Sequence, residues 1–345
     1  MISRFSWFQI RSCLLAVVVV VCLLLLLLQW QWHRSFPGNP GKENFVEIPW
    51  KAGSFRIAHI LEQKGVIAHW FWFLGYVKTV GHGRVLQAGE YLFDRPMTIP
   101  EAANKLFRGQ VYFHEVVIPE GFSLFDISDL LEKQALAPRA AFLEAARRGE
   151  LIFDLAPQAH SLEGFLFPDT YRFPRHTTPE QIVQTMVSRF RQVYQERWKF
   201  LLAGNSMRVL EAVTLASLVE KETAEADERN RIAAVFRNRL KIGMPLQCDP
   251  TVIYAARLNG TFDGKIYQGD LASKSPYNTY VHAGLPPGPI ANPGLKSIEA
   301  ALEPASVDYL YFVSNHIGGH TFSKTLEAHN RAVAVYRRGA ALPRH

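Results

Sequence analysis

The chain has 345 residues, of which 48% are hydrophobic and 20% charged, and its formal net charge is +7. This composition excludes a largely disordered chain, and the length favours two domains or one enlarged domain. The basic residues are scattered, with no run of five or more like charges, so the basic stripe typical of a nucleic-acid-binding protein is missing. A mildly basic surface suits an anionic neighbour such as a lipid face or an acidic polymer, and solubility alone also explains it.

An apolar run near the N-terminus predicts a membrane anchor. Residues 13–28 are all apolar and would span roughly 24 Å as a helix, slightly less than the ~30 Å hydrocarbon core of a bilayer. The alternative is a cleaved signal peptide, but the run continues into QWQWHRS without a small-x-small cleavage site. Aromatic residues flank the run as they do at membrane interfaces: Trp7, Phe8, Trp30 and Trp32.

Charges on the two sides of the run give a weak signal for its orientation. Arg4 and Arg11 precede it, whereas His33 and Arg34 follow it, a slight bias toward a cytoplasmic N-terminus. Everything after the run is then expected outside the cytoplasm. The predicted segments are a cytoplasmic tail at 1–12, a single-pass anchor at 13–32 and a Pro- and Gly-rich linker at 33–44.

A gapless shift of 70 residues superimposes residues 46–67 on residues 116–137. Each copy reads as a short strand, a turn and an amphipathic helix. Two copies are too few for a solenoid, so we expect paired βα units within small modules, with chance similarity as the alternative. The identical pairs are Val46/Val116, Ile48/Ile118, Pro49/Pro119, Ile57/Ile127, Leu61/Leu131 and Glu62/Glu132.

Patterns between and after the copies place further elements. Residues 69–76, HWFWFLGY, are densely aromatic and favour the core of a helix over contact with a membrane or a sugar. We also expect a short helix over 138–148, an extended, turn-rich segment over 162–174, and a long helical region from Pro179.

The stretch ASLVEKET, residues 216–223, places two glutamates beside an apolar run. We expect a helix from Ser206, as its N-cap, to about Thr223. At about 100° per residue, Glu220 falls on the apolar stripe around Val213, and Glu222 lies about 200° away from it. Glu222 therefore reads as an ordinary surface acid.

Small residues one turn before Glu220, Ala216 and Ser217, leave space beside its carboxylate. A carboxyl in such a place tends to have a raised pKa, as a general acid requires. A following helix, capped by Asp227 and ended by Gly243, offers the rival explanation of a structural ion pair with Glu220. Its arginines are Arg229, Arg231, Arg237 and Arg239.

The C-terminal part is rich in loops that combine prolines with polar motifs. Rigid loops bearing amides, hydroxyls and aromatic rings suit the binding of sugar rings, although turn chemistry explains many of these residues equally well. The residues concerned are Gln247, Asp249, Ser275, Tyr277, Asn278 and Thr279.

Metal and cofactor chemistry finds no support in the sequence. Cys13 and Cys22 lie in the apolar run and leave Cys248 alone, so zinc-type spacing and Cys-x-x-Cys pairs are both missing. G-x-S-x-G, P-loop and G-x-G-x-x-G motifs are also missing. Near the end of the chain, Gly318-Gly319 favours a strand and turn over a metal-binding helix. We expect no metal or other cofactor, although three histidines lie in that region: His316, His320 and His329.

Six motifs in one order resemble the endolytic murein transglycosylases, bacterial membrane proteins with a LysM-like module. The motifs are LEGFLFPDTY, ASLVEKET, LQCDPTVIY, SPYNTY, GLPPGPIANPG and YLYFV, followed by GGHTF and HN. They cover about residues 160–330, and their combination is highly specific. The resemblance implies that Glu220 is the catalytic acid and base. It also implies a glycan cleft lined by Glu163, Gln247, Asp249, Tyr277 and Asn278.

Two departures from the family pattern are visible. Cys248 replaces the serine usual in LQSDP, and Ala328 precedes His329-Asn330 where many members have an acid. Neither departure touches Glu220.

The resemblance implies an α+β fold and peptidoglycan strands as substrate. It implies an inner-membrane location with the catalytic domain in the periplasm, and an association with peptidoglycan synthases.

A lytic transglycosylase can work with one carboxylate; a muramidase using water would need a second, for which Glu163 and Asp249 are candidates. A non-catalytic, membrane-tethered peptidoglycan-binding scaffold is the third reading. The expected domains are a LysM-like module at 45–115, a second βα unit at 116–158 and a catalytic domain at 159–345.

Overall fold

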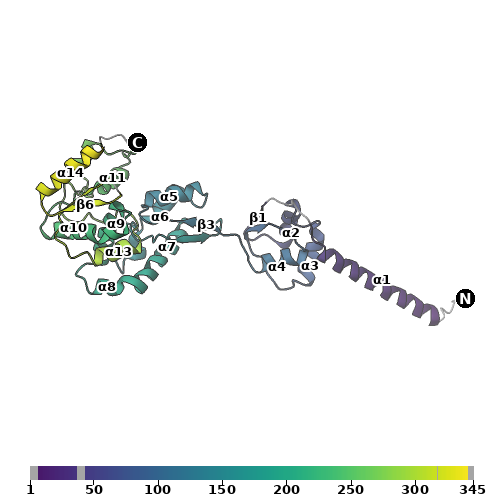
Figure 1. The fold of residues 1–345 in the computed structure, drawn as a ribbon. Helices are drawn as coiled ribbons and strands as arrows, with labels where there is room; N and C mark the ends of the chain where they lie inside the picture. Colours follow the sequence, from purple (N-terminus) through teal and green to yellow (C-terminus); the bar gives the residue numbers. More distant parts are fainter. Residues whose placement is uncertain (1–6, 37–42, 317, 341–345) are drawn as a thin grey trace. The chain divides into compact units, whose positions relative to one another are not determined.

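The computed structural model describes residues 7–36, 43–316 and 318–340 (Figure 1). Arg4 and half of the predicted linker, residues 37–42, lie outside these residues. Two compact units are present: unit 1 comprises Met1–His114 with Pro174–His176, and unit 2 comprises Glu115–Phe173 with Thr177–His345. The predicted second βα unit and the predicted catalytic domain both fall in unit 2.

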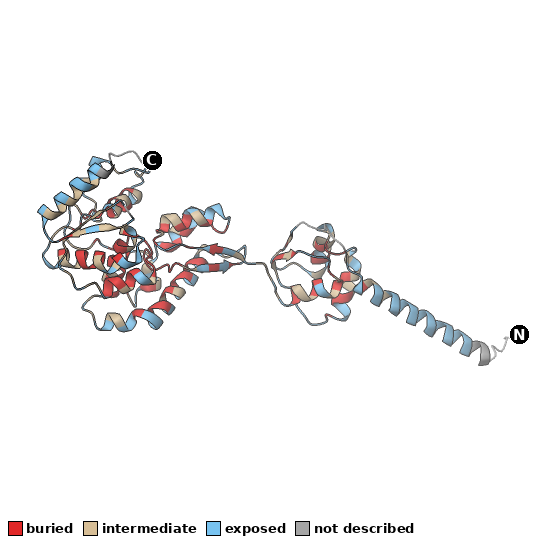
Figure 2. Ribbon diagram, in the orientation of Figure 1, coloured by how far each residue is buried: buried red, intermediate tan, exposed pale blue. Residues whose placement is uncertain are grey.

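Helix α1, Trp7–His33, contains the predicted anchor. Its segment Arg11–His33 has a mean hydropathy of 3.0, and none of its most apolar window is buried. Figure 2 shows this helix exposed along most of its length. Length and composition therefore allow α1 to cross a bilayer.

The last turn of α1 belongs to the core of unit 1. Trp32 is only 8% exposed, and its indole Nε1 donates to the carbonyl of Trp72 at 3.1 Å. Its ring also meets Tyr76 edge to face, with centroids 5.3 Å apart. The helix is thus joined to the folded part of unit 1 by packing as well as by the chain.

Along the chain, the folded part of unit 1 has two helices between two strands that pair with each other, and one more helix after the second strand. Strands β1 and β2 are antiparallel, and Val46 lies opposite Tyr91. The aromatic stretch forms α3 as expected, with Phe73 and Tyr76 buried, although Phe71 is 45% exposed. The elements are β1 Asn44–Ile48, α2 Ser54–Gln63, α3 Trp70–Thr79, β2 Gly89–Phe93 and α4 Ile99–Phe107.

Unit 2 begins with a second βα unit and continues into a helical array. Strands β3 and β4 pair with each other, and the predicted long helix begins at Pro179 behind a capping box made by Thr178 and Gln181. The elements are β3 His114–Val117, α5 Leu124–Lys133, α6 Arg139–Ala146, η1 Gly149–Ile152, β4 Thr170–Phe173, α7 Pro179–Val193, η2 Tyr194–Trp198 and α8 Lys199–Ala203.

The second half of unit 2 packs α9 against α13, with α10 beside both. Most of α9 is buried, which accounts for its nearly continuous apolar sequence. Its remaining elements are α9 Val209–Glu222, η3 Ala226–Glu228, α10 Arg229–Lys241, α11 Asp249–Leu258, α12 Gln268–Leu271, α13 Leu295–Leu302, β5 Tyr311–Ser314, β6 His320–Ser323 and α14 Leu326–Ala340.

The 70-residue repeat is confirmed by the backbone. Helix α2 shifted by 70 coincides with α5, and β1 shifted by 70 overlaps β3. The turn that follows each strand has a left-handed residue at the same position, Lys51 with φ 60° and Gly121 with φ 77°. Each helix also ends at a left-handed residue, Gly65 or Ala135. Chance similarity would not reproduce these local geometries.

Two predicted helix starts were wrong. Helix α9 begins at Val209 behind Arg208, not behind Ser206, because the Glu211 carboxylate reaches back to the Arg208 amide at 2.8 Å. Asp227 lies in the short 3-10 turn η3, and α10 starts after Glu228. Glu211, in the first turn of α9, thus replaces Ser206 as the capping side chain, whereas α10 has no side-chain cap, because the Glu228 carboxylate bonds to His320 instead.

Candidate active site

Glu220 lies in the last turn of α9 and is half-buried. Its Oε2 accepts a hydrogen bond from the backbone amide of Gly294 at 3.0 Å. Gly294 is the N-cap of α13, so the carboxylate sits at the positive end of that helix dipole. The residues one turn back, Ala216 and Ser217, are fully buried. The predicted apolar stripe therefore leads to a carboxylate held in a fixed position.

The rival explanation, an ion pair between Glu220 and an arginine of α10, is not present in the described residues. Arg239 donates to carbonyls of the loops before α11 and β5, including that of Leu310 at 2.7 Å. Arg237 contacts the Met207 sulfur, and Arg231 lies 3.8 Å from Glu228. These three arginines thus support loops and other acids, and Arg229, whose charge acts on Glu120, makes no ion pair with Glu220 among the described residues.

A second carboxylate, Glu120, approaches the same glycine. A Cβ built on Gly294 would lie 1.9 Å from Glu120 Oε1, so the carboxylate packs directly on the open face of this glycine. Burial, and then the charge of Glu220, raise the pKa of Glu120, while Arg229 lowers it. Two acids therefore converge on the start of α13. Sequence reasoning missed Glu120, although it is one of the positions at which the two copies differ.

The loop that carries Glu120 is tied to the segment before α13. The Gly121 amide donates to the Asn292 carbonyl at 2.9 Å, and the Asn292 side chain donates to the Phe122 carbonyl at 2.9 Å. On the other side, the Lys221 ammonium donates to the Gly121 carbonyl at 3.2 Å. These bonds hold the loop beside the last turn of α9.

Glu163 lies beneath this loop and is only 1% exposed. Its carboxylate accepts from the amide of Leu124, the first residue of α5, at 3.0 Å and from the Asn292 side chain at 3.1 Å. Burial raises the pKa of Glu163 to about 8, although the hydrogen bond from Leu124 opposes the shift. In this structure Glu163 supports the loop from inside and does not face solvent.

Tyr277 and Asn278 lie in the loop between α12 and α13. Tyr277 is half-buried, its ring 5.0 Å from that of Tyr254, and burial raises its pKa to about 12. Asn278 is fully buried, and its side-chain amide donates to the carbonyls of Leu271 and Ser273 at 3.0 and 2.8 Å. Asn278 therefore fixes the shape of this loop.

Gln247 and Asp249 are exposed at the start of α11. The backbone of Gln247 is left-handed, with φ 51°, and its amide donates to the Thr279 carbonyl at 3.1 Å. The Tyr280 hydroxyl donates to Asp249 Oδ1 at 2.5 Å. These contacts bring the predicted residues of the LQCDP and SPYNTY motifs together and leave the Gln247 side chain exposed.

Comparisons with known proteins show which family has this sequence pattern. The profile of the YceG-like family matches residues 46–335. The chain belongs to the YceG-like family. It is 36% identical over 307 residues to an endolytic murein transglycosylase of Bacillus subtilis, with 84% of each protein covered. A namesake from Streptococcus pneumoniae is 30% identical over 334 residues, of which the match spans 86% of this chain and 59% of that protein.

A solved structure agrees with this assignment. The crystal structure of a YceG-like protein from Listeria monocytogenes shares 37% sequence identity and a TM-score of 0.57. The match covers 84% of this chain and 98% of that one. The YceG-like fold therefore extends over most of the residues described here.

Glu222 corrects one expectation for this YceG-like chain. It was expected to be a surface acid, but its side chain is enclosed beside the Cys248 thiol and near Asp249, His320 and Arg239, and burial raises its pKa. The helical geometry did separate the two glutamates correctly, because Glu220 turns to α13 and Glu222 to the start of α11. Periodicity alone could not show that a loop covers the second face of α9.

The three C-terminal histidines have separate partners in the YceG-like fold. β5 and β6 form the expected strand and turn. His320 Nδ1 lies 2.6 Å from Glu228, His329 stacks on Tyr311, and His316 stacks on Tyr336. Each imidazole thus supports local packing.

Proposed function

We propose that the chain is a peptidoglycan lytic transglycosylase in which Glu220 is the single catalytic acid and base. The family and the two endolytic murein transglycosylases it resembles support the activity. The observation that supports the residue is the Glu220 carboxylate fixed against the Gly294 amide, without an arginine partner among the described residues. A half-buried carboxylate that is not neutralised by a structural ion pair is free to exchange a proton with a substrate.

The reaction is an internal transfer that consumes no water. Protonated Glu220 donates to the oxygen that links N-acetylmuramic acid to N-acetylglucosamine as that bond breaks. The carboxylate then takes the proton of the primary hydroxyl of the muramic acid, whose oxygen closes an anhydro ring. The substrate's acetamido group stabilises the positive charge that develops between the two steps. Cleavage falls within nascent strands and ends their elongation.

The other predicted residues have different roles in this proposal. Gln247, Asp249 and Tyr277 are partly or fully exposed and are the proposed contacts to the glycan. Asn278 and Glu163 are buried and would act by holding the loops that carry those contacts. Orientation of the strand by rigid loops contributes to the rate because the reacting atoms are already placed.

A muramidase is the second candidate, favoured by the position of Glu120. A hydrolase needs a second carboxylate to activate water or attack the sugar. Of the two acids considered for that role, Glu163 is buried and Asp249 is bonded to Tyr280. Glu120 is the acid that shares the Gly294 corner with Glu220.

Mass spectrometry of products from purified glycan strands separates the candidates. Anhydro-muramic ends support the transglycosylase, and reducing ends would replace it with the muramidase. Glu220→Gln should lower kcat by about 10²- to 10⁴-fold, because general acid and base catalysis is worth that much. Glu211→Gln, in the first turn of the same helix, is the matched control and should retain activity. A fully active Glu220→Gln would sink the assignment and favour the glycan-binding scaffold.

For the cellular setting, α1 is the proposed single-pass anchor in the bacterial inner membrane. The N-terminus would be cytoplasmic and the rest of the chain extracytoplasmic. Association with peptidoglycan synthases is proposed from the family resemblance alone.

A further inference from the structure

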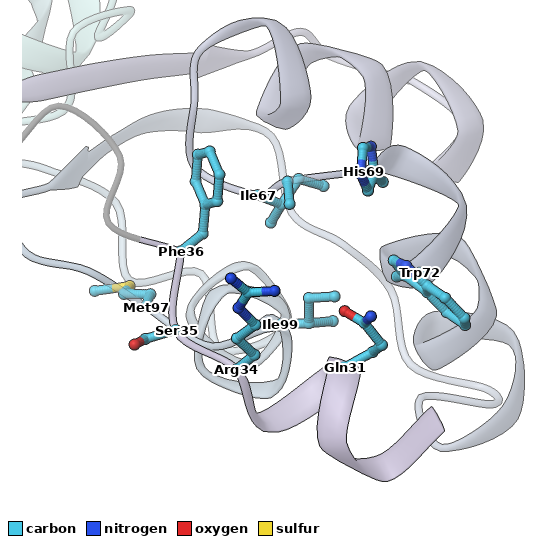
Figure 3. Close-up of a pocket in the computed structure, with 10 residues that line it drawn as sticks. Gln31, Arg34, Ser35, Phe36, Ile67, His69, Trp72, Met97 and Ile99 are labelled. Carbon is cyan, nitrogen blue, oxygen red and sulfur yellow. The ribbon is translucent and has the colours of Figure 1, made fainter. Parts of the chain in front are cut away.

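A cavity of about 320 Å³ lies where α1 meets the folded part of unit 1 (Figure 3). The end of α1 and the residues after it form one wall, and the segment before α3 forms another. The lining combines polar groups from Gln31, Arg34, Ser35 and His69 with apolar surfaces from Phe36, Ile67, Trp72, Met97 and Ile99.

Hydrogen bonds and core packing hold the segments that line this cavity. The Phe36 amide donates to the Met97 carbonyl at 3.2 Å, which ties the chain after α1 to the loop before α4. The indole of Trp32 is bonded to the Trp72 carbonyl at 3.1 Å. Ile67, which lines the cavity, is only 1% exposed and belongs to the core. The cavity is therefore part of the fold of unit 1.

Arg34 supplies a positive charge that no carboxylate of the described residues neutralises. Its guanidinium points into the space enclosed by Phe36, Ile67 and Ile99 (Figure 3) and lies 5.4 Å from the centroid of the Trp30 ring. Among the described residues no carboxylate lies within ion-pair distance of Arg34, and none lines the cavity. The nearby Glu62 is already engaged by the Trp70 amide at 3.2 Å and by His69 at 3.8 Å.

The position of Arg34 along α1 gives the depth of the cavity in a bilayer. Arg34 follows Leu28, the last residue of the apolar run, by six positions, which is about 9 Å along a helix. The run spans about 24 Å of a core of about 30 Å, so a centred run leaves Leu28 about 3 Å inside the edge of the core and Arg34 about 6 Å outside it. The headgroup layer on each side of the hydrocarbon core is roughly 5–8 Å thick. Trp30 lies between them, as expected for an interfacial belt. The cavity thus opens at the level where phospholipid phosphates lie.

We propose that this cavity binds the phosphate headgroup of a phospholipid, with the Arg34 guanidinium on the phosphate. A planar guanidinium matches two phosphate oxygens in a bidentate pair. The Gln31 amide and the Ser35 hydroxyl add donors, and the apolar side chains receive the first carbons of the lipid. The cavity holds a headgroup and not two acyl chains, which remain in the bilayer. The inference rests on the proposed anchoring of α1.

Native mass spectrometry of the full chain released from detergent tests the proposal. Delipidated protein is titrated with phosphatidylglycerol, with diacylglycerol, which lacks the phosphate, and with inorganic phosphate. One phosphatidylglycerol should remain bound, and diacylglycerol should not. Equal retention of diacylglycerol would overturn the proposal, since the site would then be merely apolar. Displacement of the lipid by inorganic phosphate would show that the site binds free phosphate, and the proposal of a phospholipid ligand would then be wrong.

Two variants test the charge of Arg34 and the open volume of the cavity separately, and a third variant is the control. Arg34→Gln should weaken binding of phosphatidylglycerol about tenfold by losing the bidentate pair. Ala68 also lines the cavity; Ala68→Phe keeps Arg34 but fills the cavity and should weaken binding similarly. Arg56→Gln, an exposed arginine on α2, should bind as the wild type does. Wild-type affinity in both cavity variants would end the proposal. A chain that fails to insert into vesicles would instead refute the anchoring.

Discussion

The two copies of the βα unit share a backbone and differ at the turn between strand and helix. In unit 1 that turn presents Trp50, which is 82% exposed. In unit 2 the equivalent residue is Glu120, whose carboxylate lies against Gly294. The left-handed residue that follows is at the same place in both, Lys51 or Gly121. One local fold thus carries an exposed ring in one unit and an acid at the candidate active site in the other, so the site depends on what packs over the turn.

The starts of the two helices differ in the same sense. Helix α2 begins behind Gly53 without a side-chain cap, whereas α5 begins behind Ser123 in a capping box with Asp126. The first amide of α5, that of Leu124, also bonds to the buried Glu163. The second copy is thereby attached to the rest of its unit through its turn, and three predictions test this difference.

The largest expected effect is a pH dependence of stability caused by Glu163. Burial raises its pKa from 4.5 to about 8, so the folded unit holds a proton that the unfolded chain releases. The contribution of this proton to the free energy of unfolding is fully present below about pH 4.5. It is lost as the pH rises toward 8, and the loss between pH 5 and 8 is on the order of 3 kcal/mol. Glu163→Gln should remove this slope.

Hydrogen exchange of the full chain measures the effect where it arises. Protection of the α5 amides, corrected for the intrinsic pH dependence of exchange, should fall from pH 5 to 8 in the wild type and stay level in Glu163→Gln. The α2 amides of unit 1 are the internal control and should behave alike in both proteins. Parallel α5 curves would show that Glu163 does not couple proton binding to folding.

A smaller effect is expected on catalysis from Glu120→Gln. The Glu120 carboxylate packs against Gly294, whose amide positions Glu220, so removing its charge changes the surroundings of the proposed acid. We expect kcat at neutral pH to fall about tenfold, a small part of what general acid and base catalysis contributes. Trp50→Gln, at the same turn of the other copy, should leave kcat unchanged. An unchanged kcat in Glu120→Gln would show that the two carboxylates act independently.

The smallest effect concerns the left-handed residue of each turn. Gly121→Ala puts a Cβ on a backbone with φ 77°, 3.4 Å from Glu220 Cγ, and should destabilise unit 2 by about 1 kcal/mol. Lys51→Gly removes the same strain from unit 1 but adds chain entropy in the unfolded state, so the change should stay within about 0.5 kcal/mol. Denaturant unfolding measures the free energy of unfolding of both variants. A larger loss in Lys51→Gly than in Gly121→Ala would contradict the equivalence of the two turns.

The sequence predicted those features that depend on local pattern. The apolar run, the 70-residue repeat, the long helix from Pro179 and the position of Glu220 on a buried stripe all follow from periodicity and capping over one or a few turns. The resemblance to the endolytic murein transglycosylases, predicted from six short motifs in one order, is confirmed by the YceG-like family and by the relatives of that name. Ser206 and Asp227 were wrong as caps by only a few residues. Glu211 bonds to the Arg208 amide and so starts α9 later, and α10 starts behind Glu228 without a side-chain cap.

The features missed depend on contacts between distant segments. Glu222 was predicted to be exposed, but the loop before α11 covers it. Glu120 passed unnoticed because its significance depends on Gly294, far along the chain. The burial of Glu163 likewise comes from Leu124 and Asn292. Residue type and spacing do not determine which loops meet in three dimensions.

The bonds made by Asn292 set the order in which the candidate site can form. Its side chain joins residues 170 and 129 positions earlier, at Phe122 and Glu163, and such contacts of high sequence separation are slow to close. A growing chain that has emerged only as far as α9 already contains Glu220 but has neither Asn292 nor the Gly294 amide. The candidate site is therefore assembled only after synthesis has passed Gly294, and a shorter chain carries the Glu220 carboxylate without the amide that positions it.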